Sequence, residues 1–75
     1  MSKPTRITNS IRALRFARGE MTQAELAQRI GVTRQTIIAI EQGRYSPSLE
    51  VAFQIARVSK VPLDEVFQYP DGESR

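Results

Sequence analysis

The sequence contains no cysteine and no histidine among its 75 residues. Without cysteine there are no disulfides and no thiolate metal sites, so nothing in the composition indicates secretion. Histidine, the commonest acid–base side chain, and glycine-rich phosphate loops are both missing. The eight carboxylates show no spacing that converges on an acid–base or metal site. We predict that the protein is not an enzyme and binds no metal or cofactor.

Long hydrophobic runs are also absent. The stretch MSKPTRITNS lacks the apolar segment of a signal peptide, and nothing approaches the roughly 18 apolar residues of a membrane span. A chain of 75 residues that is 40% hydrophobic builds one compact core, but not a cleft enclosing a substrate. We predict one cytoplasmic domain with no membrane contact and no small-molecule ligand. Because so small a core contributes little free energy of folding, we expect a partner subunit to add stability.

Acidic residues are scarce in the first part of the chain. Residues 1–44 carry eight basic and three acidic side chains, whereas residues 45–75 carry three and five. The basic part would be attracted to a polyanion. Arginines on a small helical domain are also commonly just solvated, so the asymmetry alone identifies no partner.

The apolar spacing is helical almost throughout and predicts about five short helices with little room for strands. The first runs from about 9 to 18, and Gly19 stops it. The fourth follows Pro47 and Ser48 and continues to about 58, and a short fifth follows Pro62. The side chains expected to face the core on these three helices are Ile11, Leu14, Ala17, Leu49, Ala52, Phe53, Ala56, Leu63, Val66 and Phe67.

The strongest local signals lie between residues 21 and 43. Thr22 and Glu25 form a capping-box pattern at the start of a second helix, and Gly31 ends it. Thr33 then caps a third helix, which ends at Gly43. A connection of only three residues, with a glycine able to adopt a positive φ, sets the two helices at a steep angle rather than antiparallel. This pattern predicts a helix-turn-helix.

The motifs resemble those of the phage repressor and Cro-type (Xre) helix-turn-helix DNA-binding domain. The resemblance covers about residues 8–69 and rests on TQAELAQRIGVTRQTI, IEQG, YSPSL and VPLDEVF. It implies an all-α, compact, lambda-repressor-like domain of five helices, spanning 1–75 with flexible termini at 1–7 and 70–75. The implied function is a transcriptional regulator, a repressor that binds double-stranded DNA as a homodimer on a pseudo-palindromic operator.

Three residues depart from the family pattern. Ile38 stands where a polar residue such as Asn or Ser is usual, which leaves the base preference open. Lys60 stands where glycine is common after the fourth helix. Either the backbone of this lysine adopts the left-handed conformation, or the helix ends with a different cap. Pro62 replaces the usual Ser or Thr cap of the fifth helix.

The third helix carries the candidate base-reading residues. Ile37 and Ile40 point to the core, so the opposite side faces outward. N-terminal residues of a helix in the major groove reach base edges first. Ile38 would pack on a thymine methyl or is simply a lone exposed apolar residue; both readings stay open. The predicted base-reading set is Thr33, Arg34, Gln35, Thr36, Ile38 and Ala39.

Four further residues are candidates for phosphate contacts. Gln23, at the start of the second helix, lies where backbone N–H groups favour an anion, and the resemblance implies the same role. Three residues that follow the third helix would contact the phosphate backbone of DNA, unless they are merely solvated: Gln42, Arg44 and Tyr45. The resemblance also implies a structural ion pair between Arg15 and Glu41.

A homodimer is expected to use the end of the chain. Leu63, Phe67 and Tyr69 are the candidate interface residues, although they would serve equally well as monomer core. The alternative function is an antitoxin-like or protein-interaction module whose main partner is another protein. Steep salt dependence and sequence preference would favour DNA, whereas salt-insensitive binding to one protein would favour the alternative.

Overall fold

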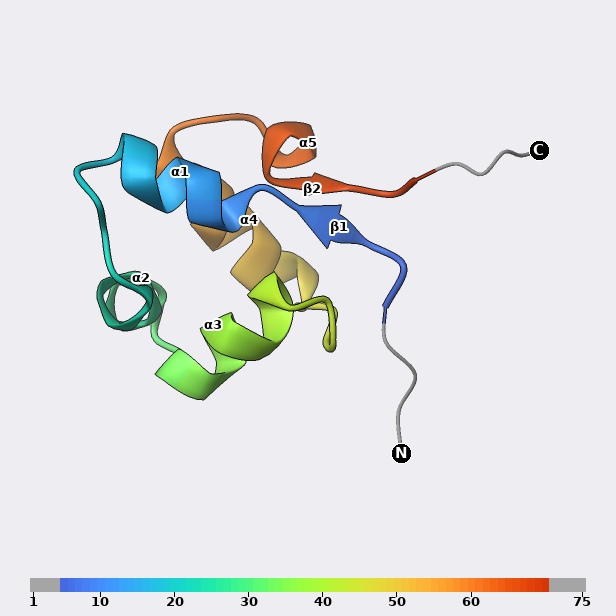
Figure 1. Ribbon diagram of the computed structural model, residues 1–75, viewed down its shortest axis with the longest axis horizontal. Helices are drawn as coiled ribbons and strands as arrows, with labels where there is room; N and C mark the ends of the chain where they lie inside the picture. Colours follow the sequence, from blue (N-terminus) through green and yellow to red (C-terminus); the bar gives the residue numbers. More distant parts are fainter. Residues whose placement is uncertain (1–4, 71–75) are drawn as a thin grey trace.

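The computed structural model describes residues 5–70, which form five helices and one two-residue β-ladder (Figure 1). The all-α, five-helix prediction is confirmed. Most of the termini predicted to be flexible lie outside the described residues. In chain order the elements are β1 (Thr8–Asn9), α1 (Ile11–Ala17), α2 (Gln23–Ile30), α3 (Arg34–Glu41), α4 (Leu49–Ser59), α5 (Leu63–Val66) and β2 (Phe67–Gln68).

Local capping places α2 and α3 where the sequence predicts them. The Thr22 hydroxyl accepts a hydrogen bond from the Glu25 backbone N–H at 3.0 Å, and the Glu25 carboxylate accepts one from the Thr22 N–H at 2.9 Å. Gly31 ends α2 in the left-handed conformation at φ 78°. The Thr33 hydroxyl caps α3 by accepting from the Thr36 N–H at 3.1 Å. These bonds occupy backbone groups that a helix terminus would otherwise leave unpaired.

The short connection 31–33 keeps α2 and α3 from running antiparallel, although the two helices pack against each other. Figure 1 views α2 almost along its axis while α3 is seen from the side, so the two axes are far from parallel. α4 runs behind α1 and α3, and α5 and the ladder lie at the opposite end of the molecule from α2 (Figure 1). The predicted helix-turn-helix is therefore formed by α2 and α3.

The β-ladder was not expected and shortens two predicted helices. Thr8 pairs with Gln68 and Asn9 with Phe67 in antiparallel register. Asn9 consequently precedes α1 instead of starting it, and Phe67 follows α5 instead of belonging to it. The pairing continues in a bond from the Ser10 N–H to the Val66 carbonyl at 2.9 Å. The helical periodicity was misleading here because an antiparallel partner sixty residues away supplies the backbone bonds.

The core gathers one stripe of side chains from each helix. Its largest fully buried members are Ile11, Leu26, Ile37, Ile40, Ile55 and Val66. The prediction that Leu49 and Phe53 face this core is wrong, since they are 72% and 53% exposed. On α4 the inward stripe is Ala52, Ile55, Ala56 and Ser59, and the 3.6-residue period turns Leu49 and Phe53 away from it. Ala17 of α1 is exposed as well.

The ends of α4 and α5 resolve two departures from the family pattern. Lys60 ends α4 in the left-handed conformation at φ 61°, so the lysine accepts the strain that glycine would avoid. Pro62 precedes α5 with no side-chain cap.

The residues just before β1 bond to the loop after α3. Thr5 donates its N–H to the Gly43 carbonyl at 3.1 Å and accepts a bond from the Ser46 hydroxyl at 2.8 Å. The residues just before β1 are therefore attached to the loop that follows α3.

Candidate nucleic-acid interface

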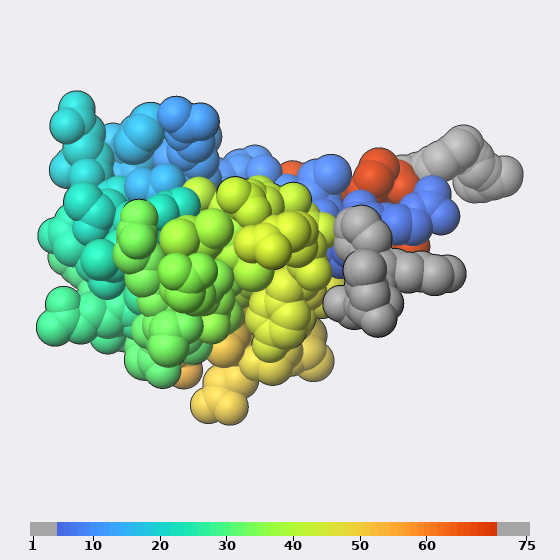
Figure 2. All heavy atoms as spheres, turned by 60° about the horizontal axis from the view of Figure 1, so that its bottom comes forward, coloured from blue at the N-terminus to red at the C-terminus, as the bar shows by residue number. Residues whose placement is uncertain are grey.

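α3 lies on an outer face of the molecule with its N-terminal turn uncovered. In Figure 2, α3 (green) occupies this face between α2 (teal) and the loop that follows it (yellow), and α1 (blue) forms the upper edge. The Thr33 and Thr36 hydroxyls lie 2.9 Å apart and bond to each other. Arg34 and Gln35 are exposed, and no side-chain hydrogen bond engages either within residues 5–70. The first turn thus presents one guanidinium and one amide to an external ligand.

The second turn of α3 has a more apolar outer surface. Ile37 and Ile40 are buried at 0% and 2% exposure, which fixes the inward side of the helix. Ile38 and Ala39 are half-buried. Ile38 is not among the partly buried hydrophobic residues that pack against the core, so part of its side chain faces outward. A small apolar area therefore follows the polar first turn.

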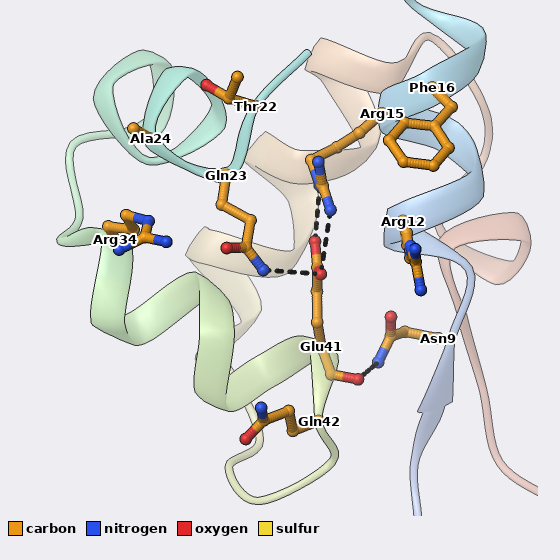
Figure 3. A pocket seen from close by; sticks show the side chains of 10 residues that line it. All are labelled: Asn9, Arg12, Arg15, Phe16, Thr22, Gln23, Ala24, Arg34, Glu41 and Gln42. Atoms are coloured by element: carbon orange, nitrogen blue, oxygen red, sulfur yellow. Dashed lines mark hydrogen bonds and ion pairs between the residues drawn. The ribbon is translucent and has the colours of Figure 1, made fainter. Parts of the chain in front are cut away.

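A hydrogen-bonded network holds the C-terminal turn of α3. The Arg15 Nε lies 2.7 Å from the Glu41 Oε2 and its Nη2 lies 3.2 Å from the Oε1, so the ion pair is bidentate. Each side chain is only 10% exposed. Gln23 donates from its Nε2 to the same Oε1 at 3.1 Å, as Figure 3 shows. Three helices thus meet at one carboxylate, which fixes the position of α3 relative to α1 and α2.

Asn9 adds a second fastening at the end of α3. Its side-chain N–H donates to the Ile40 carbonyl at 3.0 Å and to the Glu41 carbonyl at 3.4 Å. Its Oδ1 accepts the Ile11 N–H at 3.1 Å. One amide therefore accepts the first N–H of α1 and donates to two carbonyls in the last turn of α3, of which the Ile40 carbonyl also accepts the Gly43 N–H at 3.0 Å. Sequence reasoning missed this residue because an asparagine before a helix suggests only a local cap.

The loop after α3 contains the other predicted phosphate ligands. Arg44 donates from its Nε to the Gln42 Oε1 at 2.8 Å, so these two exposed side chains form one unit. Tyr45 is 49% exposed. The loop is also held by Thr5, which donates its N–H to the Gly43 carbonyl and accepts a bond from the Ser46 hydroxyl. Within residues 5–70, the terminal guanidinium N–H groups of the exposed Arg44 make no hydrogen bond.

A cleft of about 650 Å³ opens between α1, α2 and α3 (Figure 3). Five residues proposed from the sequence line it: Arg15, Gln23, Arg34, Glu41 and Gln42. Five that sequence reasoning left out also line it: Asn9, Arg12, Phe16, Thr22 and Ala24. The other predicted contacts on α3 and its loop lie outside the cleft. The basic residues of α1 are visible in the sequence, but only the tertiary structure shows that Arg12 and Arg15 line a cleft with α3.

Comparison with protein families matches residues 11–66 to the model described as helix-turn-helix. The match spans all five helices of the fold. The chain belongs to the Xre-type helix-turn-helix family. Its members are DNA-binding transcriptional regulators, and this protein is one of them.

Curated relatives of this helix-turn-helix protein carry the same designation. An uncharacterized HTH-type transcriptional regulator of Methanocaldococcus jannaschii is 53% identical over 71% of this chain and 80% of its own length. The cryptic phage CTXphi transcriptional repressor RstR of Vibrio cholerae is 39% identical over 79% of this chain and 52% of its length. The crystal structure of a candidate DNA-binding protein from Bacteroides fragilis has a TM-score of 0.71 at 22% identity, covering 83% of this chain and 98% of that one, which shows the shared fold.

A second surface of the helix-turn-helix protein is apolar. The predicted dimer residues Leu63 and Phe67 are half-buried against the core, whereas Tyr69 is 65% exposed with Arg6 5.9 Å from its ring centre. Leu49 and Phe53 stand exposed on the neighbouring helix, α4. A hollow of about 150 Å³ separates the two sets; Ile7, Pro47, Leu49, Ala52, Leu63 and Phe67 line it.

Residues 5–70 contain neither a metal-ligating cluster nor a membrane-spanning helix. Within this part of the chain, no group of three acidic side chains is arranged to hold a metal ion. None of its helices has the length and apolar character required to cross a lipid bilayer.

Proposed function

We propose that this regulator is a repressor that inserts α3 into the major groove of a pseudo-palindromic operator. The observation that carries the proposal is the exposed Arg34–Gln35 pair on the first turn of a helix that is held at both ends. Thr33 caps one end, and the Arg15–Glu41 pair anchors the other. A major groove admits one α-helix, whose leading side chains meet the base edges.

The base-reading roles follow from the chemistry of these side chains. Arg34 matches the O6 and N7 acceptors of guanine, and Gln35 matches the N6 and N7 groups of adenine. The paired Thr33 and Thr36 hydroxyls present one O–H for a base or a phosphate. Ile38 and Ala39 provide the apolar area that suits a thymine methyl, the one apolar group in the major groove.

Backbone phosphates would bind on both sides of α3. Within residues 5–70, Gln23 has no hydrogen-bond partner for its Oε1 or for its second amide hydrogen. It stands at the N-terminus of α2, where the helix dipole favours an anion. The Gln42–Arg44 unit and Tyr45 stand at the other end of α3. Such contacts place the protein on the duplex without reading its sequence.

Two copies of the chain would bind the two halves of the operator. The apolar surface formed by Leu63, Phe67 and Tyr69, together with Leu49 and Phe53 of α4, supports a homodimer, since an apolar patch of this kind marks an interaction site. A two-fold dimer sets its recognition helices about 34–36 Å apart, one turn of duplex. The likeness to a phage repressor supports repression as the outcome.

Selection of bound fragments from random duplex DNA, at a stated salt concentration, tests the proposal. We expect an enriched pseudo-palindrome whose half-sites are about 10–10.5 base pairs apart, protected together in a footprint. Placed over a promoter, that sequence should lower transcription when the protein is added. Equal affinity for all duplexes, or salt-insensitive binding to a protein partner alone, would instead support the antitoxin-like alternative.

A further inference from the structure

The cleft between α1, α2 and α3 has an excess of positive charge at its opening. Arg12 and Arg34 line opposite sides of it, on α1 and α3 (Figure 3). Within residues 5–70, no carboxylate lies within 4.0 Å of either guanidinium, since the one ion pair there joins Arg15 and Glu41. Both arginines are exposed. Their charges are therefore available to an anion that approaches from outside.

The single acidic residue that lines the cleft does not oppose this charge. Glu41 is 10% exposed, and its carboxylate accepts bonds from both the Arg15 guanidinium and the Gln23 amide. Its negative charge is compensated inside the protein. What remains toward solvent is the field of Arg12 and Arg34, in a hollow where low-dielectric walls strengthen it.

Phe16 gives Arg12 a defined position. The Arg12 guanidinium carbon lies 5.6 Å from the centre of the Phe16 ring, and the Arg15 guanidinium carbon lies 5.5 Å from the same centre. The ring is 52% exposed, so both guanidinium groups near it remain accessible to a ligand from outside. A cation held within about 6 Å of an aromatic face is attracted to it and loses less freedom when it binds a second group.

We propose that this cleft seats a backbone phosphate of the bound duplex, that Arg12 binds this phosphate, and that Phe16 positions the Arg12 guanidinium. The inference rests on the proposed function and adds a contact on α1 to those assigned to α2, α3 and the following loop. The hollow is large enough for a phosphate with its waters, since a water occupies about 30 Å³ of liquid. Arg12 thereby extends the contact with one strand beyond the groove that α3 reads.

The test compares the full chain with its R12Q and F16L variants on two duplexes, the fragment recovered by selection and one of random sequence. Loss of one phosphate contact lowers the slope of log affinity against log salt by about 0.9. Between 50 and 200 mM salt the affinity of R12Q should therefore fall by about 3- to 4-fold less than that of the parent chain. The change should be the same on both duplexes, because a phosphate carries no sequence information.

F16L keeps every charge and tests the positioning role. We expect it to weaken binding by about 2- to 5-fold, the range of one exposed cation–π contact. In the R12Q background the same change should have no effect. A loss that persists in that background would show that Phe16 acts through Arg15 instead, and would overturn its assigned role.

R29Q is the matched control, because Arg29 is an exposed arginine on α2 that does not line the cleft. Its salt slope should equal that of the parent chain. If R12Q and R29Q have equal slopes while the parent chain prefers the selected duplex and binds it with a steep salt dependence, the phosphate site is wrong and the proposed function stands. If the parent chain binds no duplex, both proposals fall together.

Discussion

Gln23 and Glu41 lie 3.1 Å apart, amide nitrogen to carboxylate oxygen, and this bond joins the first turn of α2 to the last turn of α3. The same carboxylate binds Arg15 of α1. The orientation of α3 relative to α1 and α2 therefore depends on the Glu41 carboxylate, which side chains of both other helices bind. A ligand that contacts α3 therefore meets a helix whose orientation is already set.

Breaking the Arg15–Glu41 pair should destabilise the fold. Arg15→Ala or Glu41→Ala leaves the other charge poorly solvated, which costs about 3–5 kcal/mol in buried pairs. Urea unfolding measures the loss. Arg18→Ala is the control, because Arg18 is an exposed arginine at the C-terminal end of α1, and it should leave the unfolding free energy unchanged. The double variant should lose much less than the two single losses added together; strict additivity would show that the two side chains do not act as a pair.

Removing the first exposed side chains of α3 should weaken binding to the operator more than binding to DNA of random sequence. Arg34→Ala and Gln35→Ala each should cost about 1–3 kcal/mol on the operator, since one base contact is lost. Both residues are exposed, so the unfolding free energy should stay unchanged. Titrations on the selected duplex and on a random one provide the measurement. An equal loss on both would assign Arg34 or Gln35 to the phosphates.

The Ile38 contact can be tested by changing the base instead of the protein. Replacing thymine with uracil removes the methyl group and nothing else from the major-groove edge. We expect operators with uracil at the contacted position to bind the parent chain more weakly, whereas Ile38→Ser should bind both forms alike. Equal affinities for the parent chain would leave Ile38 as a lone exposed hydrophobic residue.

The apolar surface that includes Leu49 and Phe53 should determine whether the protein is a dimer or a monomer in solution. Leu49→Lys and Phe53→Lys together should convert the proposed dimer into a monomer without unfolding it, because both side chains are more than half exposed. Sedimentation equilibrium gives the mass, and circular dichroism checks the fold. Phe16→Lys alters an equally exposed aromatic residue on α1 and should leave the dimer intact. A dimer that survives the double change must use another surface.

Lys60 offers a stabilising substitution. Its φ of 61° costs an ordinary residue about 1–2 kcal/mol, part of which glycine regains despite its greater freedom in the unfolded chain. Lys60→Gly should therefore raise the unfolding free energy by about 0.5–1 kcal/mol. Lys60→Ala keeps the strain and should not stabilise. Matching gains for both variants would trace the effect to the lysine charge.

Several features follow from the sequence because their causes lie within one helical turn. The Thr22–Glu25 capping box, the Thr33 cap and the glycine at position 31 each depend on neighbouring residues, so helix boundaries could be predicted there. The helix-turn-helix and its exposed Arg34–Gln35 pair come from the same local signals. Helical periodicity was less reliable for α4, because it specifies which residues share a face but not which face a neighbour covers.

The tertiary structure alone decided which distant segments meet. No local pattern pairs Thr8 with Gln68, brings the Asn9 amide to the end of α3, or turns Arg12 and Phe16 toward the cleft. Each of these contacts depends on the packing angle of whole helices, which many side chains set together. The sequence by itself determined the presence of the five helices and the polar first turn of α3, because capping and periodicity are short-range. The inward face of α4, the β-ladder and the geometry of the cleft depend on how the whole helices pack.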